Sequence, residues 1–227
     1  MNLATKLIAL LAVISFILTD TDTMNAQEIQ FPAPVTTGGL PANEVMARRH
    51  SCREFDSART VDEATLGQLL WMTLGINRPD AQPTKFGAPA NRTNPTALNS
   101  QEITAYVFTT DGVYEYLPAS HSLRKAVDGD HRALLTGTES FRQEFVLDAP
   151  LSILLVADTA KLPEGDMGRA MALVDAGIAD GNLNVAAESL GLATVPRATM
   201  DSAAISRLLG LTSTLLPVIN NPIGYAK

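Results

Sequence analysis

Hydrophobic residues recur at helical spacing in four stretches of the chain, and residues that favour helix ends flank them. A capping box of Thr60 and Glu63 opens one stretch, and Asp201 is a good N-cap for another. The longest stretch covers 168–190, which is about 35 Å at 1.5 Å per residue. We therefore predict four helices, over residues 43–49, 60–74 and 168–190 and from Asp201 to Gly210.

Other stretches have the pattern of β-strands. Residues 102–109 and 113–117 flank the turn dipeptide Asp111-Gly112, which is typical of a β-hairpin. Residues 151–157 are continuously apolar, as in a strand buried on both faces, and residues 215–219 indicate a final strand. Residues 77–99 hold four prolines and indicate an irregular loop. Helices around a small sheet predict an α+β domain.

The first 26 residues differ from the rest of the chain. Lys6 precedes an apolar run from Leu7 to Leu18, and a short polar stretch then ends at Ala26. This order is typical of a cleaved secretory signal, since about twelve apolar residues are fewer than the roughly 20 that a spanning helix needs. An uncleaved membrane anchor is the alternative. We expect a signal peptide over 1–26, one domain over 27–227 without a stable membrane span, and export to the periplasm or secretion.

Composition restricts the classes of function. The formal net charge is −7, and loss of residues 1–26 with one lysine and two aspartates leaves −6. An acidic protein of this kind is not expected to bind nucleic acid or anionic membrane surfaces. The single Cys52 excludes an internal disulfide, and the chain lacks metal-ligand spacing for a structural zinc. No Gly-x-Gly-x-x-Gly follows a strand, so a Rossmann-type nicotinamide site is not expected. The class of function that remains is chemistry on a small-molecule substrate.

Residues 49–53 are the strongest candidate for binding an anion. In an extended segment Arg49, Ser51 and Arg53 point to one side, because side chains alternate with period two. Two guanidinium groups and a hydroxyl suit a phosphate monoester dianion, since arginine binds phosphate oxygens in a bidentate way. Taken alone, the same triplet is also typical of a solvated surface run.

Three stretches in a fixed order add to this interpretation. They are residues 49–56 (RHSCREFD), 95–101 (PTALNSQ) and 190–196 (LGLATVP). Each has an ordinary explanation by itself, such as a helix stop followed by a loop for the third. Their order and spacing together resemble the signatures of the FMN-dependent nitroreductase family, with Thr96 where the family usually has serine.

The resemblance implies a flavin site built from all three stretches. The first would hold the FMN phosphate and ribityl chain, the second would lie along the flavin, and residues at the end of the third would cover the isoalloxazine with a backbone N–H near N5. The cofactor-binding residues implied in this way are Arg49, His50, Ser51, Arg53, Pro95, Thr96, Ala97, Asn99, Pro196, Arg197, Ala198 and Thr199. Many members add basic residues near the C-terminus, where this chain has only Lys227, so we expect Arg49, Ser51 and Arg53 to bind most of the phosphate.

The resemblance also implies an activity. NAD(P)H would reduce the flavin and leave before a small organic acceptor, nitroaromatic or quinone-like, enters the same pocket, which is a ping-pong hydride transfer through N5. The flavin supplies the chemistry, so no general acid or base is assigned. Two alternatives stay open: a flavin dehydrogenase of a modified peptide or other specialised substrate, because residues 70–78 and Arg92-Thr93 resemble the azoline-oxidising branch, and a non-catalytic exported binding protein.

The implied fold is an α+β, nitroreductase-like domain with a small mixed or antiparallel sheet surrounded by helices, and it is implied to be a homodimer. Gly177 and Gly181 lie four residues apart on one face of the long helix. Glycine destabilises a helix interior by roughly 1 kcal/mol, so close approach of another backbone is a reasonable compensation. That backbone can belong to a second copy or to the same chain, and the sequence leaves both open.

Overall fold

The computed structural model describes residues 28–81 and 90–227, and the expected signal peptide lies outside them. The elements in chain order are β1 (Glu28–Gln30), α2 (Ala42–Arg48), α3 (Glu63–Leu74), β2 (Ile76–Arg78), β3 (Asn91–Arg92), η1 (Ala97–Asn99), β4 (Ile103–Phe108), β5 (Gly112–Leu117), β6 (Ser122–Asp128), η2 (Arg132–Leu135), β7 (Gly137–Thr138), β8 (Phe141–Arg142), η3 (Glu144–Asp148), β9 (Leu151–Asp158), η4 (Thr159–Lys161), α4 (Asp166–Ser189), β10 (Ala193–Thr194), α5 (Ser202–Leu209) and β11 (Leu215–Gly224), where η marks a 3-10 helix.

One sheet organises the described part of the chain. Its strand order is β1-β6-β5-β4-β9-β11-β10, and every neighbouring pair is antiparallel. The expected α+β class is therefore confirmed, with a sheet larger than the pattern predicted. The hairpin β4–β5 and the strand β9 occupy the predicted places, whereas β1, β6 and β10 were not predicted and β11 continues five residues past the expected end at Ile219.

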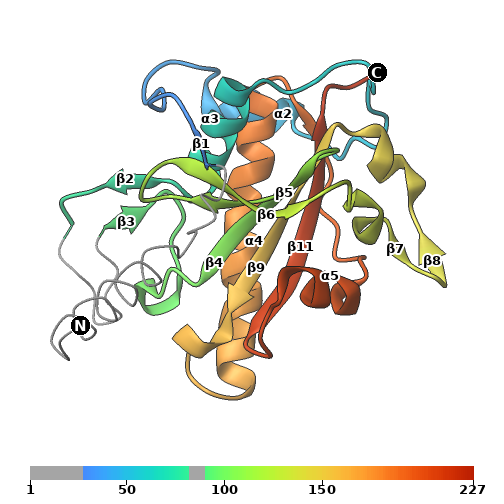
Figure 1. The fold of residues 1–227 in the computed structure, drawn as a ribbon. Helices are drawn as coiled ribbons and strands as arrows, with labels where there is room; N and C mark the ends of the chain where they lie inside the picture. Colours follow the sequence, from blue (N-terminus) through green and yellow to red (C-terminus); the bar gives the residue numbers. More distant parts are fainter. Residues whose placement is uncertain (1–27, 82–89) are drawn as a thin grey trace, which may run out of the picture.

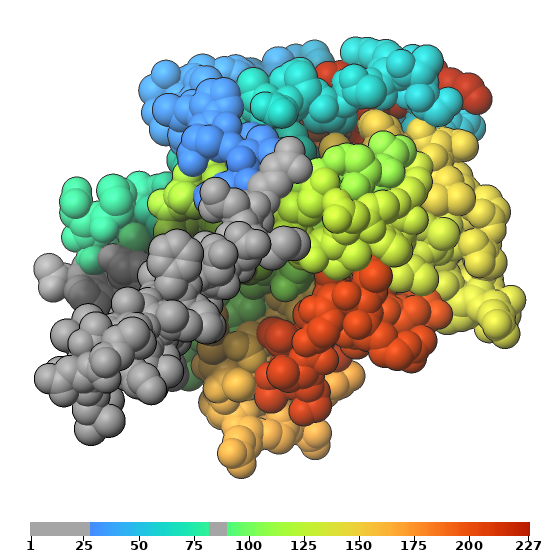
Figure 2. All heavy atoms as spheres, in the orientation of Figure 1, coloured from blue at the N-terminus to red at the C-terminus, as the bar shows by residue number. Residues whose placement is uncertain are grey.

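The helices cover the two faces of this sheet unequally. The long α4 crosses one face, with α3 and α2 beside it, and α5 with η2 and η3 covers the other face (Figure 1). On the surface in Figure 2, α5 lies next to the strands β5 and β6. Strand β9 is continuously apolar because both of its faces are buried. Ile153 and Leu155 join the core under α3 and α4, and Leu154 and Val156 join the core under α5.

Capping residues fix the ends of the helices. The predicted capping box at Thr60 is wrong, because Asp62 is the N-cap of α3 and its carboxylate accepts the Thr65 N–H at 2.9 Å. The carboxylate of Asp62, two residues after Thr60, competes better than the threonine hydroxyl for the free amides of the first turn. Asp201 caps α5 as predicted, accepting the Ala204 N–H at 2.9 Å, and Gly210 ends α5 in the left-handed region with φ 62°.

The stretch 77–99 is only partly the irregular loop that its prolines predict. Strands β2 and β3 pair with each other as a short ribbon, and residues 97–99 form one 3-10 turn. Part of the stretch, including Pro83 and Pro89, lies outside the described residues. Ribbon pairing between residues about 15 apart leaves no local pattern, which is why the sequence does not reveal it.

Candidate functional site

The segment after α2 is held in place by pairing with two distant parts of the chain. The Cys52 N–H donates to the Thr194 carbonyl at 3.0 Å, and the Lys227 N–H donates to the Glu54 carbonyl at 3.2 Å. The next residue, the buried Phe55, stacks on Phe145, with ring centroids 6.5 Å apart. The first and third motif stretches therefore lie side by side, and the chain from 225 to 227 borders them.

Two adjoining hollows flank this segment. Arg49, which is half-buried, lines a pocket of about 180 Å³ together with Asn184 and Glu188 from α4. Ser51 and Arg53, which are exposed, line a more open depression of about 510 Å³. His50, Cys52 and Ala226 border both hollows. Ser51 and Arg53 thus share one hollow, and Arg49 reaches the neighbouring one across the same short segment.

The charges here are mostly positive. Within residues 28–81 and 90–227, neither Arg49 nor Arg53 has a carboxylate at ion-pair distance. Lys227 lines the same depression as Arg53, although sequence reasoning gave it no role. Its only signal was a cation near a predicted terminal strand, and the contact depends on long-range pairing. Glu54 and Glu188 are the acidic residues of the two hollows.

Arg197 has a structural environment. Its guanidinium donates to the carbonyls of Leu135 and Thr136 and to the side chains of Gln143 and Asn220, and its backbone pairs with Asn220 in both directions. Burial lowers the pKa of Arg197, and it is only 6% exposed. This side chain therefore anchors the stretch after β10, while its neighbours Pro196 and Ala198 are exposed and Thr199 is half-buried.

The second motif stretch lies elsewhere. The Ala97 N–H donates to the Asp175 carboxylate of α4 at 2.8 Å, whereas the Arg49 pocket is lined by Asn184 further along the same helix. Nine residues of α-helix separate these two points by about 14 Å. Pro95, Thr96 and Asn99 belong to this same loop. Within one chain the structure brings the first and third stretches together and leaves the second apart.

Sequence reasoning did not find two buried carboxyl groups, Asp180 on α4 and Glu102 directly before β4. Burial raises the pKa of Asp180 to about 6, although Asn221 and Asn184 donate hydrogen bonds that lower it. Burial also raises the pKa of Glu102 to about 7, with the Ser100 hydroxyl opposing and Asp175 adding to the shift. Nothing in the local sequence marks these groups, because their partners come from distant strands and helices.

The outer face of α4 exposes apolar and small residues. Met167 and Val174 are 65% and 61% exposed, and Ile178 follows on the same face. Gly177 and Gly181 are also exposed, and a Cβ built on either would meet no atom within 4 Å. Packing within the described part of the chain therefore does not require glycine at these two positions.

Residues 28–81 and 90–227 show neither a candidate metal site nor a candidate membrane span. Those residues contain no group of three or more His, Cys, Asp or Glu side chains placed to hold a metal ion. No helix among them is both long enough and apolar enough to cross a membrane.

Known proteins share both the sequence and the fold. A curated relative from Methanocaldococcus jannaschii, "Putative nitroreductase MJ1384", is 27% identical over 210 residues, which are 89% of this chain and 97% of that protein. The crystal structure of "a putative nitroreductase" from Ralstonia eutropha JMP134 superimposes with a TM-score of 0.76 at 27% identity, covering 89% of this chain and 91% of that one.

A chain of the Escherichia coli microcin synthetase McbBCD complex, solved with truncated pro-MccB17 bound, has the same fold. Its TM-score is 0.63 at 18% identity, with 92% of this chain and 82% of that chain covered. The model of the nitroreductase family matches residues 46–225, which include all three motif stretches. The chain therefore belongs to the nitroreductase family and is an oxidoreductase.

Proposed function

We propose that this protein is an FMN-dependent oxidoreductase that takes hydride from NAD(P)H and passes it to a small nitroaromatic or quinone-like acceptor. One observation carries the proposal: the segment 49–53 is fixed by backbone pairing with Thr194 of β10. It presents to two adjoining hollows guanidinium groups that have no ion-pair partner among the described residues. The segment 49–53 and Thr194 belong to the two motif stretches assigned to the flavin phosphate and to the ring.

The donor set fits a flavin phosphate. Arg49 and Arg53 are cations without an ion-pair partner among the described residues, and Ser51 adds a hydroxyl at the depression that Lys227 also lines. Charge-assisted hydrogen bonds from such groups are about twice as strong as neutral ones. We assign Arg49, Ser51, Arg53 and Lys227 to the phosphate, with His50 at the border of both hollows.

The remaining residues position the reaction. FMN supplies the hydride chemistry when it is bound. Arg197 fixes the backbone from Pro196 to Thr199, so that the exposed segment around Ala198 keeps one conformation. A fixed amide donor needs no reorganisation when charge develops nearby, which is how such groups lower a barrier. We assign no side chain to proton transfer.

We further propose that the active form is a two-fold homodimer that packs through α4. The loop 95–101 and the segment 49–53 lie about 14 Å apart along α4, so a second copy running the other way along the helix would bring its own loop to this chain's phosphate segment. The exposed face with Met167, Val174 and Gly177 provides an apolar, small-residue surface for such packing.

We also propose that the protein is exported after removal of residues 1–26, and that it acquires FMN outside the cytoplasm. The support is the short apolar run before Ala26.

Spectroscopy tests the proposed function. The purified mature protein is expected to be yellow, or to become so with FMN, and to be bleached by NADH or NADPH without oxygen. Nitroaromatic or quinone acceptors should restore the colour with ping-pong kinetics. A colourless protein that FMN does not reconstitute would overturn the proposal and favour a binding protein. A flavin that only a modified peptide reoxidises would favour the dehydrogenase alternative.

A further inference from the structure

The loop 95–101 has an unusual backbone. Leu98, Asn99 and Gln101 all have positive φ, at 57°, 51° and 51°. Asparagine enters this left-handed region readily, but leucine and glutamine do so rarely, because the Cβ then approaches the following carbonyl. Three such residues within four positions persist only where the surrounding structure holds them.

Two carboxyl groups supply much of that support. The Asp175 Oδ2 accepts the Ala97 N–H at 2.8 Å, and the Glu102 Oε2 accepts the Ser100 hydroxyl at 2.5 Å. Within the loop, the Gln101 N–H donates to the Thr96 hydroxyl at 3.0 Å. The first two contacts lie on either side of Leu98 and Asn99, so the loop is attached to α4 on one side and to the residue before β4 on the other.

The two carboxyl groups also interact with each other. Glu102 is fully buried and Asp175 is 3% exposed, and after burial the neighbouring Asp175 carboxyl group is among the causes that raise the pKa of Glu102. Two neighbouring buried carboxyl groups repel each other strongly when both are ionised, so the state in which Glu102 keeps its proton is favoured. The Glu102 Oε1 is buried and has no hydrogen-bond partner in the part of the chain that the structure describes.

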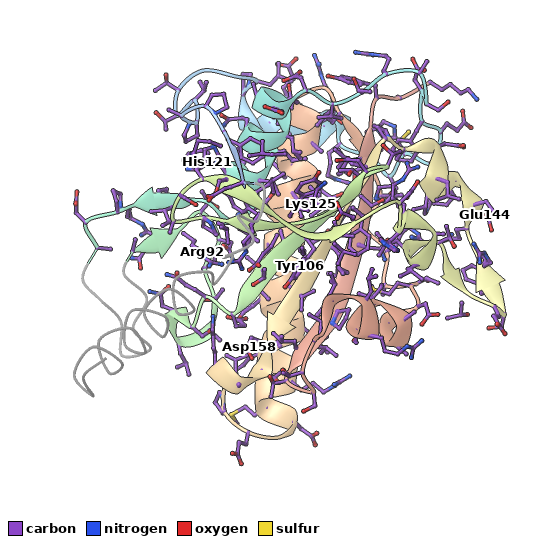
Figure 3. The ribbon with its side chains drawn as sticks, in the orientation of Figure 1. Arg92, Tyr106, His121, Lys125, Glu144 and Asp158 are labelled. Atoms are coloured by element: carbon purple, nitrogen blue, oxygen red, sulfur yellow. The ribbon has the colours of Figure 1, made fainter. Side chains whose placement is uncertain are left out.

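The other charged groups nearby do not neutralise the two carboxyl groups in place of that proton. Arg92 of β3 is labelled in Figure 3. It interacts electrostatically with Tyr116 of β5 and with Glu102. Its guanidinium donates to the Ile103 carbonyl at 2.7 Å rather than to either carboxyl group. The carboxylate of Asp158, whose own N–H donates to the Glu102 carbonyl, accepts from Ala160.

We propose that Glu102 and Asp175 are positioning residues which share one proton and thereby hold the loop 95–101 in the conformation that faces the flavin. The part that concerns the flavin rests on the proposed function, whereas the part that concerns the loop does not. While the pair shares a proton, both anchors are in place. As the pH rises past about 7, loss of that proton places two negative charges side by side, and the loop loosens.

Hydrogen exchange of the Ala97 amide tests the loop without any flavin. Exchange rates of the full mature chain, corrected for intrinsic pH dependence, would be compared at pH 6 and pH 8.5. For the wild type we expect protection of Ala97 to fall about tenfold or more at the higher pH, as for loss of a charge-assisted hydrogen bond. Glu102→Gln, which mimics the protonated acid, should keep protection equal at both values.

Three further variants complete the test. Asp175→Ala should lose protection at both pH values, and Asp175→Asn, which keeps an acceptor, should restore it. Glu115→Gln is the matched control, since this glutamate of β5 pairs with Arg124 and should keep the wild-type pH response. Equal protection at both pH values in the wild type, or the same pH response in Glu102→Gln, would overturn the proposal even if Asp175→Ala fails to fold.

The flavin-loaded protein tests the remaining part. Asp175→Ala should shift the visible absorption band and raise KM for the acceptor about tenfold, while Asp175→Asn restores both. An unchanged spectrum and unchanged kinetics in a variant with a loosened loop would overturn the role toward the flavin. A wild type that binds no FMN at all would overturn the proposed function, while the exchange result would still decide the role of the carboxyl pair.

Discussion

Replacement of Gly177 and Gly181 by alanine distinguishes a free α4 face from a dimer interface. A Cβ built at either position meets no atom of the described chain within 4 Å, so an isolated subunit has room for both methyl groups. Alanine is favoured over glycine in a helix interior by about 1 kcal/mol at each position. The double variant would therefore gain roughly 2 kcal/mol if the face were free in solution, which corresponds to about 4–8 °C in Tm for a domain of this size.

In the proposed dimer, the same substitutions are expected to lower the stability. Two helices that approach through glycines leave no room for added methyl groups, and overpacking a close contact costs about 1–3 kcal/mol or more. We expect the double variant to have a lower, more concentration-dependent Tm and to dissociate at micromolar concentration. Thermal unfolding and light scattering on the same samples provide the measurement.

A control calibrates the scale of these effects. Ala203 lies exposed on α5, away from α4, and Ala203→Gly should lower stability by at most about 1 kcal/mol without changing the mass in solution. The Gly177→Ala, Gly181→Ala variant could instead be more stable than the wild type by the full gain of roughly 2 kcal/mol, with both proteins having the mass of a monomer. That result would refute the proposed dimer interface on α4.

Three other predictions follow from buried groups and from the N-terminus. Because the pKa of Glu102 is raised from 4.5 to about 7, its contribution to stability is present below pH 4.5 and is lost as the pH rises to 7. The wild type should lose about 3 kcal/mol at most over this range relative to Glu102→Gln, as measured by urea unfolding at pH 4.5 and 7.5, and parallel pH profiles would contradict this. Arg197→Lys should lose about 3 kcal/mol or more, since one ammonium cannot make the four hydrogen bonds of the guanidinium; a loss under about 1 kcal/mol would show that these bonds matter little. Intact mass of the protein from its native host should fit a chain that begins at Gln27, and a mass that includes Met1 would exclude the signal peptide.

Local signals explain what the sequence could reveal. The Asp111-Gly112 turn, the apolar run of β9 and the glycine after α5 each act through neighbouring residues, and all three elements were predicted. The family signatures likewise identified the stretches 49–56 and 190–196, which the structure places side by side.

Long-range pairing explains what could not be predicted. Strand β11 contains Pro217 and Pro222, and proline within a run normally argues against a central strand because it cannot donate to the ladder. The strand tolerates both because one of its neighbours, β10, pairs with it over only two residues. The partners of Glu102, Arg197 and Lys227 also come from distant segments, so the local sequence could not identify their contacts.

The phosphate site provides the most direct test of the central claim. Arg49→Ala and Arg53→Ala should each weaken FMN binding about tenfold to a hundredfold, since a charge-assisted hydrogen bond contributes about 1.5–3 kcal/mol. Riboflavin lacks the phosphate, so its affinity should change much less, and Ser51→Ala should show the same pattern with a smaller loss. Arg48→Ala is the matched control, because this neighbouring arginine is exposed at the end of α2 and pairs with Glu44.

The deciding measurement is the ratio of FMN to riboflavin affinity, obtained by titrating each variant with both ligands. Our account predicts a ratio that falls at least about tenfold in Arg49→Ala and Arg53→Ala and stays at the wild-type value in Arg48→Ala. Equal weakening of both ligands, or no weakening of either, would mean that Arg49, Ser51 and Arg53 form a solvated surface run and would contradict the assignment of this segment to the flavin phosphate.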